Sequence, residues 1–297
     1  MKTHQFTSPS TGLTLSARSL GDGPTILFLH GFPDNELTFD KQLKAVAKAG
    51  YRGMSLKTRG YEASSQPANG NYELLSMAED VVSVINELNE DKVHLVGHDW
   101  GAAIAYRAAS LAPQKLHSLT TLALPHPGRF INEMILYPKQ IKLSWYIFFF
   151  QLGFVAKAKI KRNNFQFIRS LWKNWSPNWT APNAHIEKVL ETFQQPGVLS
   201  SALQYYQQVL TLKAFTPSTR KEALFKVAVP TLAISGGQDG CIDSQTFEKM
   251  MHTEDFPQGL RFERIDHAGH FPHLEHAELT NELIINWVNE HSSTKPS

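Results

Sequence analysis

Residues 96–102 read VGHDWGA and place a single aspartate, Asp99, between two glycines. A near-continuous apolar run, residues 93–97, precedes the aspartate, and the helix-forming string AAIAYRAA follows it. The run is typical of a strand buried on both faces of a parallel sheet. The two glycines let that strand turn sharply into the helix, with the carboxylate held at the turn beside a helix N-terminus. This stretch therefore predicts a strand, a tight turn and a helix.

The same alternation of short apolar runs and longer amphipathic stretches extends in both directions from this junction. It predicts an α/β fold with a mostly parallel central sheet flanked by helices. The expected strands are residues 25–31, 51–56, 93–97, 116–124, 230–235 and 260–265, and the expected helices are residues 41–50, 72–90, 244–251 and 279–288, with one more that starts near Gly101.

The alternation stops in one long segment that is helix-like and rich in aromatic residues. We expect residues 128–215 to form a helical cap inserted into a core made of residues 1–127 and 216–297. A chain of 297 residues is long enough for one large α/β domain that carries such an insertion. An insertion between strands lies over their carboxyl ends, which is where α/β sheets place their sites.

The composition excludes several classes of protein. Hydrophobic residues make up 42% of the chain and charged residues 19%, so the chain is neither disordered nor fibrous. The net charge of +2 gives no indication of a nucleic-acid partner. Cys241 is the single cysteine, so it has no intramolecular disulfide partner, and we interpret it as a residue that packs a loop.

The sequence also predicts a cytoplasmic protein without a membrane span. The first residues lack the pattern of a secretory signal. The most apolar stretch, residues 143–156, is too short to cross a bilayer and contains Gln151. The cations that follow it suit an interfacial helix, but we interpret them as a solvated helix face; they are Lys157, Lys159, Lys161 and Arg162.

Two other strand ends supply partners for the aspartate. An isolated aspartate at a junction of this kind is more often a helix N-cap, so these partners decide its role. HGFPD, residues 30–34, follows the first strong strand, and the Phe32 N–H could join the Trp100 N–H in an oxyanion hole. SGGQDG, residues 235–240, ends a later strand and contains Asp239.

A histidine-rich string, DHAGHFPHLEHAE at residues 266–278, supplies a candidate base. Histidines spaced by three could bind a metal, but nothing keeps all four on one face, so we expect no metal and no cofactor. We expect His270 to act as the base. The order Asp99, Asp239, His270 is that of the nucleophile, acid and base in hydrolase triads. Asp243 is a rival acid, but Asp239 directly follows the strand and a glycine pair.

Together, HGFPD, GHDWGAAIAYRAA, SGGQDG and DHAGHFPHLE resemble the epoxide hydrolase branch of the α/β-hydrolase superfamily over nearly the whole chain. The resemblance implies an α/β-hydrolase fold and a cap with two tyrosines that donate hydrogen bonds to the epoxide oxygen. The strings SWYIFFFQ and SALQYYQQ place these at Tyr146 and Tyr206, with Tyr205 as an alternative.

One loop departs from the family. Related enzymes usually carry Asp-x-Arg-Gly-Tyr-Gly after the second strand, whereas this chain reads KTRGYEASS with Lys57 and Glu62. The loop supplies no catalytic group in the family. The departure therefore concerns the structure of the loop and the rim of the pocket.

The expected reaction is the hydrolysis of an epoxide to a vicinal diol. Asp99 attacks an epoxide carbon, and water activated by His270 then hydrolyses the resulting ester. A dehalogenase is the main alternative, because a carboxylate also displaces halide from carbon and tryptophans could bind the ion; the candidates are Trp100, Trp145, Trp172, Trp175 and Trp179. An ordinary esterase would form a mixed anhydride, and a non-catalytic binding protein would need no triad.

The aromatic cap predicts a small apolar substrate. Its residues include Phe148, Phe149, Phe150 and Trp145, and the near-neutral charge suits an uncharged ligand that needs no steering. We expect the pocket to be lined by Trp145, Phe149, His30 and Pro33.

Overall fold

The computed structural model describes residues 1–9, 11–211 and 216–292, and its centre is an eight-stranded sheet. The strands run in the order β1-β2-β4-β3-β5-β6-β7-β8. The pairs β1–β2 and β2–β4 are antiparallel and the other five are parallel, so the predicted mostly parallel sheet is confirmed. The strands are β1 (Lys2–Thr7), β2 (Thr14–Leu20), β3 (Thr25–Leu29), β4 (Arg52–Leu56), β5 (Val93–His98), β6 (Leu116–Leu122), β7 (Thr231–Gly236) and β8 (Leu260–Ile265).

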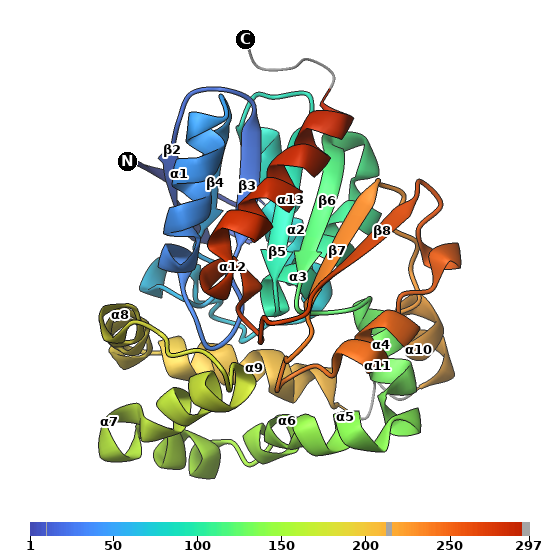
Figure 1. Ribbon diagram of the computed structural model, residues 1–297. Helices are drawn as coiled ribbons and strands as arrows, with labels where there is room; N and C mark the ends of the chain where they lie inside the picture. Colours follow the sequence, from blue (N-terminus) through green and yellow to red (C-terminus); the bar gives the residue numbers. More distant parts are fainter. Residues whose placement is uncertain (10, 212–215, 293–297) are drawn as a thin grey trace.

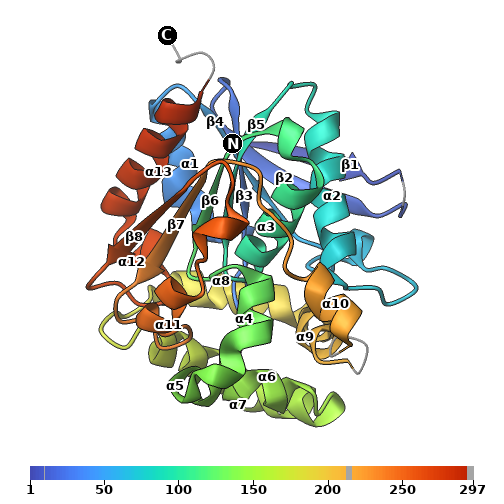
Figure 2. The ribbon, with the colours of Figure 1, turned by 90° about the vertical axis from the view of Figure 1, so that its right-hand side faces the viewer.

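Helices cover both faces of the sheet. Figure 2 shows α1 (Asp40–Lys48) and α13 (Ala277–His291) on one side, with α2 (Leu74–Glu87) and α3 (Trp100–Leu111) on the other. Two apolar cores correspond to these two faces. The central strands β3 and β5 are buried along their whole length, which explains their unbroken apolar runs. Short elements complete the core: α11 (Ser244–Lys249), α12 (Pro272–Glu275), η1 (Glu36–Phe39), η2 (Ala63–Ser65), η3 (Pro113–Lys115) and η6 (Thr253–Asp255).

The predicted strands and helices of the core are present, with ends that differ by one to three residues in most cases. The antiparallel hairpin of β1 and β2 was not predicted. In β2, buried and half-buried residues alternate, which is the pattern of an edge region with one face on the core. The polar turn between the two strands and their exposed first residues concealed that pattern.

The cap consists of helices that lie together below the sheet in Figure 1. In the described part of the chain they are α4 (Pro127–Glu133), η4 (Met134–Leu136), α5 (Pro138–Leu143), α6 (Trp145–Phe150), α7 (Phe154–Trp175), α8 (Asn183–Gln194) and α9 (Val198–Val209), and α10 (Pro217–Glu222) then leads back to the core. Helix α7 is interrupted at Arg162–Phe165, where Asn163, Asn164 and Phe165 have positive φ.

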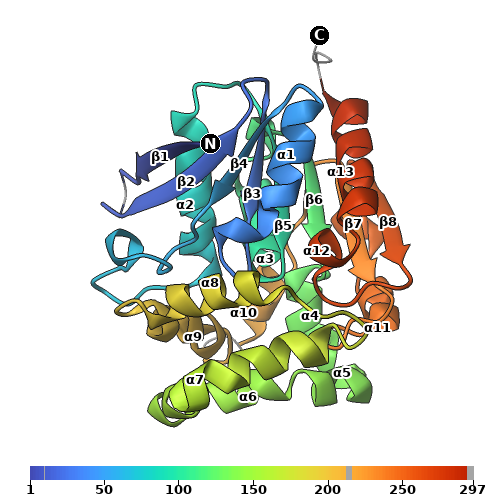
Figure 3. The ribbon, with the colours of Figure 1, turned by 60° about the vertical axis from the view of Figure 1, so that its left-hand side comes forward.

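The expected end of the cap at Phe215 lies outside the described residues, so the division into residues 1–127, 128–215 and 216–297 stays a prediction. Figure 3 shows α5, α6 and α7 at the bottom of the molecule, at the end of the cap away from the sheet. None of the helices within residues 1–9, 11–211 and 216–292 has the length and apolarity needed to cross a membrane.

Candidate active site

Asp99 occupies a sharp turn between β5 and α3. Its backbone has φ 50° and ψ −120°, a conformation that costs free energy in a non-glycine residue. The turn requires bare backbone on either side: a Cβ at Gly97 would lie 2.3 Å from the Gly101 carbonyl oxygen, and one at Gly101 would lie 2.0 Å from that of Leu29. The two glycines of the sequence motif therefore permit the close contact of β3, β5 and α3 that holds the carboxylate in place.

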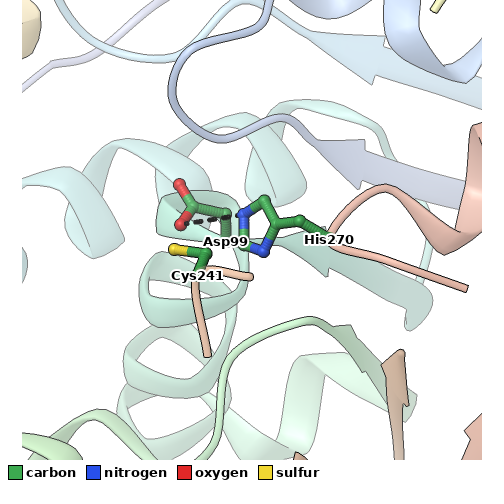
Figure 4. Close-up of side chains that lie close together, drawn as sticks. All are labelled: Asp99, Cys241 and His270. Carbon is green, nitrogen blue, oxygen red and sulfur yellow. Dashed lines mark ion pairs between the residues drawn. The ribbon is translucent and has the colours of Figure 1, made fainter. Parts of the chain in front are cut away.

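Asp99, His270 and Asp239 form a chain of three side chains at the carboxyl ends of the parallel strands. His270 Nδ1 donates to Asp239 Oδ2 at 2.9 Å, and His270 Nε2 lies 3.6 Å from Asp99 Oδ2. Figure 4 shows the imidazole and the Asp99 carboxylate facing each other. Asp239 Oδ1 accepts hydrogen bonds from Cys241 N at 2.6 Å and Ile242 N at 3.0 Å. The geometry thus brings together the three side chains that the sequence predicted as nucleophile, base and acid.

Asp243, the rival acid, makes its contacts away from the side chains of Asp99, His270 and Asp239. Its side chain caps helix α11 by accepting from Thr246 N and Thr246 Oγ1, and it forms an ion pair with Lys139. Lys139 and the bonds to Thr246 lower the pKa of Asp243, although burial opposes the shift. Asp243 is therefore a helix cap, which leaves Asp239 as the carboxylate on His270.

The charge state of His270 follows from its two carboxylate neighbours. The imidazole is fully buried, and burial alone would lower its pKa. The charges and hydrogen bonds of Asp239 and Asp99 outweigh burial and raise the pKa of His270 to about 10. At neutral pH the resting site therefore holds an imidazolium between two carboxylates.

The two expected oxyanion donors lie on either side of Asp99. Phe32 N donates to Asp99 Oδ1 at 2.8 Å. Trp100 begins α3, so its N–H is among those that a helix leaves without an intrahelical acceptor. A Cβ at Gly31 would lie 2.5 Å from Asp99 Oδ1, so glycine is needed for the 30–34 loop to come this close.

The histidine string does not form a cluster of ligands. His273 is buried beside η1, with Nε2 2.7 Å from Thr38 Oγ1, whereas His267 is exposed and His276 is half-buried. In the described chain, the side chains that could hold a metal ion together are Asp99, Cys241 and His270, whose ligand atoms lie within 4.8 Å of one another. His98 supports this group, because its Nε2 donates to the His270 carbonyl oxygen at 2.8 Å.

Cys241 lies inside the site, and interpreting it as a loop-packing residue missed this position. Its side chain lies beside Asp99 and His270 (Figure 4). Its Sγ atom is 3.3 Å from the Tyr146 hydroxyl, while its backbone N–H binds Asp239. Burial raises the pKa of the thiol, and the nearby charges of Asp239 and Asp99 add to the shift. Cys241 therefore links the acid loop to the cap tyrosine as a neutral thiol. The sequence feature that could have indicated this position is that Cys241 lies two residues after Asp239.

The two cap tyrosines lie together above Asp99. The rings of Tyr146 and Tyr206 are 5.7 Å apart and both line the same cavity as Asp99. Burial raises the pKa of both hydroxyls. The Tyr206 hydroxyl has no hydrogen-bond partner of ordinary geometry among the described residues. By contrast, the Tyr205 hydroxyl donates to the Arg59 carbonyl oxygen at 2.5 Å and does not line the cavity.

The cavity has a volume of about 380 Å³ and an almost wholly apolar wall. Polar atoms reach it from Asp99, Trp100, Tyr146 and Tyr206. The other lining residues are Leu74, Ala103, Leu124, Pro127, Phe130, Ile131, Met134, Ile135, Ile141, Ile147, Phe148, Val209, Leu210 and Ile242. The site therefore suits an uncharged apolar molecule with one polar centre.

The four expected pocket residues do not line this cavity. Trp145 is 48% exposed, and Phe149 packs on Phe167 of α7 with ring centroids 5.3 Å apart. The α6 residues that line the cavity are Tyr146, Ile147 and Phe148. The prediction that Trp145 and Phe149 line the pocket was wrong.

The other two expected pocket residues belong to the 30–34 loop, which binds other parts of the molecule. His30 donates from Nδ1 to the Gly31 carbonyl oxygen and packs against Tyr61. The Pro33 carbonyl oxygen accepts a hydrogen bond from Trp172 Nε1 of the cap at 2.9 Å. The loop therefore places the Phe32 N–H on Asp99 and attaches the cap, but it supplies no cavity wall.

Two further contacts attach the cap to the same loop. Asn35 Nδ2 donates to Thr192 Oγ1 at 3.0 Å, and His185 Nε2 lies 3.0 Å from Asp34 Oδ1. The Asp34 charge raises the pKa of His185, although burial of the imidazole opposes the shift. The last residue of the HGFPD motif thus holds helix α8.

The loop after β4, where the sequence departs from the family pattern, stabilises the fold. Glu62 accepts from Ser16 N at 2.7 Å and lies 3.9 Å from Lys57 Nζ. Arg59 makes two hydrogen bonds to the buried Asp80 of α2, at 2.6 and 2.7 Å. Lys57 and Glu62 thus stabilise the loop, and neither lines the cavity.

Comparisons with known proteins agree with this geometry. A family model described as alpha/beta hydrolase fold matches residues 24–277. The AB hydrolase superfamily protein YfhM of Bacillus subtilis is 28% identical over 282 residues, covering 94% of this chain and 96% of the relative. Human Epoxide hydrolase 4 is 26% identical over 279 residues, covering 92% and 74% of the two chains.

A solved structure is similar over the full length. It is a single-residue mutant of an epoxide hydrolase from Bacillus megaterium, complexed with its product (R)-3-[1]naphthyloxy-propane-1,2-diol. Its TM-score is 0.81 at 28% identity, covering 96% of this chain and 100% of that chain. These matches confirm the resemblance to epoxide hydrolases that the motifs indicated.

Proposed function

Because the chain belongs to the alpha/beta hydrolase family, we propose that it hydrolyses an epoxide to a vicinal diol through a covalent ester on Asp99. The observation that carries the proposal is the joint placement of Asp99, Tyr146 and Tyr206 on one apolar cavity. A carboxylate on one side can attack carbon, while two hydroxyls on the other can receive the departing oxygen.

In the first step, Asp99 Oδ2 forms a bond to an epoxide carbon and the ring C–O bond breaks. Oδ1 already accepts from Phe32 N, so Oδ2 is the oxygen available for attack. The released alkoxide takes a hydrogen bond and then a proton from Tyr146 or Tyr206. Both hydroxyls are protonated at the start, because burial raises their pKa.

The second step hydrolyses the ester, and the first step prepares it. Esterification removes the negative charge of Asp99, which is one of the two charges that hold the pKa of His270 near 10. His270 then gives its proton to the tyrosinate that the first step leaves, and its Nε2 accepts a proton from water. The water oxygen attacks the Asp99 carbonyl carbon while the N–H groups of Phe32 and Trp100 stabilise the oxyanion. The acyl C–O bond then breaks, and the diol oxygen takes the proton of the new Asp99 carboxyl group, which restores the Asp99 carboxylate beside protonated His270.

An isotope experiment tests this sequence of steps. Enzyme in excess over 1-naphthyl glycidyl ether, in water labelled with ¹⁸O, is quenched after one turnover. We expect an unlabelled diol, since its new oxygen comes from Asp99, and one ¹⁸O atom in the peptide that contains Asp99. A labelled diol in the first turnover would overturn the covalent mechanism.

The dehalogenase alternative makes a different prediction in the same assay. Trp145 is exposed on the outer surface, and Trp172 donates its N–H to Pro33. Neither lines the cavity, and of the five candidate tryptophans Trp100 alone does, so the cavity offers at most one tryptophan N–H to a halide. We therefore expect no halide release from 1-bromobutane at a rate comparable with epoxide turnover, and release faster than diol formation would reverse the assignment.

A further inference from the structure

The end of the cap away from the sheet carries many exposed apolar side chains. In the described part of the chain, eleven large apolar residues are exposed, and seven of them fall within residues 135–155. The most exposed is Phe154, at 83%. We call these seven residues the cap patch: Ile135, Leu136, Trp145, Phe148, Leu152, Phe154 and Val155.

The cap patch is continuous along the fold. Its residues come from η4, α6, the α6–α7 turn and the start of α7, and α5 packs between η4 and α6. Figures 1 and 3 both place α5, α6 and α7 side by side at this end of the molecule. Gly153, with φ 54°, lets the turn project Leu152 and Phe154 outward.

The same segment has a one-sided charge. Residues 134–186 contain eight lysines and arginines and no aspartate or glutamate, whereas the whole chain has a net charge of only +2. Within the described residues, Lys139 and Arg169 pair with acidic side chains and Lys157 with Ser200. The other five are exposed and have no ion pair there: Lys142, Lys159, Lys161, Arg162 and Lys173.

The cap patch also borders the mouth of the cavity. Ile135 and Phe148 are exposed on the outer surface and line the cavity at the same time. An apolar ligand that leaves a lipid phase at the patch would therefore meet an apolar wall all the way to Asp99. This continuity connects the surface feature to the site.

We propose that the cap patch docks on an anionic phospholipid surface, with the mouth of the cavity facing the lipid. Phenylalanine, tryptophan and leucine insert at the headgroup boundary, while the flanking lysines and arginines contact phosphate groups. A second copy of the chain is the less favourable occupant, since two surfaces of this charge repel each other. The cations after residue 156, interpreted from the sequence as a solvated face, thereby become part of the docking surface.

Vesicle flotation tests the proposal without any assay of turnover. The intact protein is mixed with vesicles of phosphatidylglycerol and phosphatidylcholine, or of phosphatidylcholine alone, at low and high salt. We expect flotation with the anionic vesicles at low salt only. Lys159→Gln with Lys161→Gln should weaken binding about thirty-fold, and the matched pair Lys44→Gln with Lys48→Gln on α1 should leave it unchanged.

A second measurement reports which face touches the lipid. Trp145 belongs to the cap patch, so brominated lipids should quench part of the tryptophan fluorescence, and Trp145→Phe should abolish that part. Phe154→Ser should reduce flotation, whereas Leu279→Ser, an exposed residue on α13, should not. Circular dichroism confirms that each variant is folded.

Three outcomes would overturn the proposal. The first is no flotation of the wild-type protein with anionic vesicles at low salt. The second is flotation that is unchanged both in the Lys159→Gln, Lys161→Gln variant and in Phe154→Ser, which would place the lipid contact elsewhere. The third is a dimer in sedimentation velocity that Phe154→Ser dissociates, which would assign the patch to a second copy. Because lipid binding is measured without substrate, failure here leaves the proposed epoxide hydrolysis unaffected.

Discussion

His270 Nε2 lies 3.6 Å from Asp99 Oδ2, on the side of the imidazole opposite Asp239. The nucleophile is therefore also a charge partner of the base. The Asp99 charge helps to raise the pKa of His270 to about 10, so the resting base is protonated and becomes competent only when that charge disappears. The two halves of the proposed reaction are coupled through this one contact.

The coupling predicts a measurable change in the Asp99→Asn variant. We expect the pKa of His270 to fall, because the amide carries no charge to stabilise the imidazolium. A pH titration of ¹³C-labelled histidine by NMR follows the shift, and His270→Gln assigns the signal. Asp266→Asn, at an exposed carboxylate, serves as the control. An unchanged pKa in Asp99→Asn would contradict the coupling.

The tyrosine assignment predicts two different outcomes for three tyrosine hydroxyls. Tyr146→Phe and Tyr206→Phe should each slow ester formation by roughly 10²-fold, the lower end of the usual contribution of a general acid. Tyr205→Phe is the matched control, since its hydroxyl binds the Arg59 carbonyl outside the cavity. Rapid-quench measurement of the alkyl-enzyme gives the rate. A larger loss in Tyr205→Phe than in Tyr206→Phe would reverse the assignment.

The meeting of Asp99, Asp239 and His270 was predictable from sequence because each lies within five residues after the end of a strand. In a parallel sheet, the carboxyl ends meet at one edge, so Asp99, Asp239 and His270 must converge whatever the cap does. The glycines around Asp99 added a local backbone signal that needed no tertiary information. The strand cores were equally accessible, since unbroken apolar runs reflect burial on two faces.

The pocket wall was not predictable in the same way. On α6, neighbouring side chains point about 100° apart, and the aromatic string SWYIFFFQ does not show which of them face the cavity. Tyr146 lines the cavity, whereas the adjacent Trp145 is exposed. Cys241 was missed for a related reason. The direction of its thiol depends on how the Asp239 loop meets a helix about 95 residues earlier in the chain.

The thiol contact predicts a split between two substitutions at Cys241. Cys241→Ser keeps a hydrogen-bonding group beside Tyr146 and should retain most of the epoxide turnover. Cys241→Val fills the space but removes the partner 3.3 Å from the Tyr146 hydroxyl, so kcat should fall while KM changes little. Steady-state kinetics distinguish the two. Equal kcat values for the two variants would show that Cys241 only fills space.

The ion pair between His185 and Asp34 predicts a pH-dependent attachment of the cap. The pKa of His185 is raised in the folded protein, because the Asp34 charge outweighs the effect of burial. The free energy that the His185–Asp34 ion pair adds to the folded state is fully present below the pKa of about 6.5 that His185 has in the unfolded chain. It is lost as the pH rises through the higher pKa of His185 in the folded protein. The free energy of unfolding of His185→Asn should therefore differ most from wild type near pH 6.

Denaturant unfolding of both proteins between about pH 6 and pH 9 measures that difference. His270 titrates over the same range in both proteins, so its effect cancels in the comparison. Hydrogen exchange of the α8 amides should show the cap opening first at high pH. A stability difference that is constant across the range would mean that His185 contributes by packing alone.

The buried ion pair of Arg59 and Asp80 predicts the largest loss of stability. Both side chains are 2% exposed, and Arg59 also donates to the backbone of Asn71 and Ser76. Asp80→Asn would leave the guanidinium buried without its counter-charge, which costs about 3–5 kcal/mol.

Glu290→Gln is the control. It removes an exposed ion pair with Arg261 and should change the free energy of unfolding by less than about 1 kcal/mol. Chemical denaturation of the two variants measures both values. If the two losses were equal, the loop after β4 would be stabilised by its other contacts, such as those of Glu62 with Ser16, and the Arg59 ion pair would be dispensable.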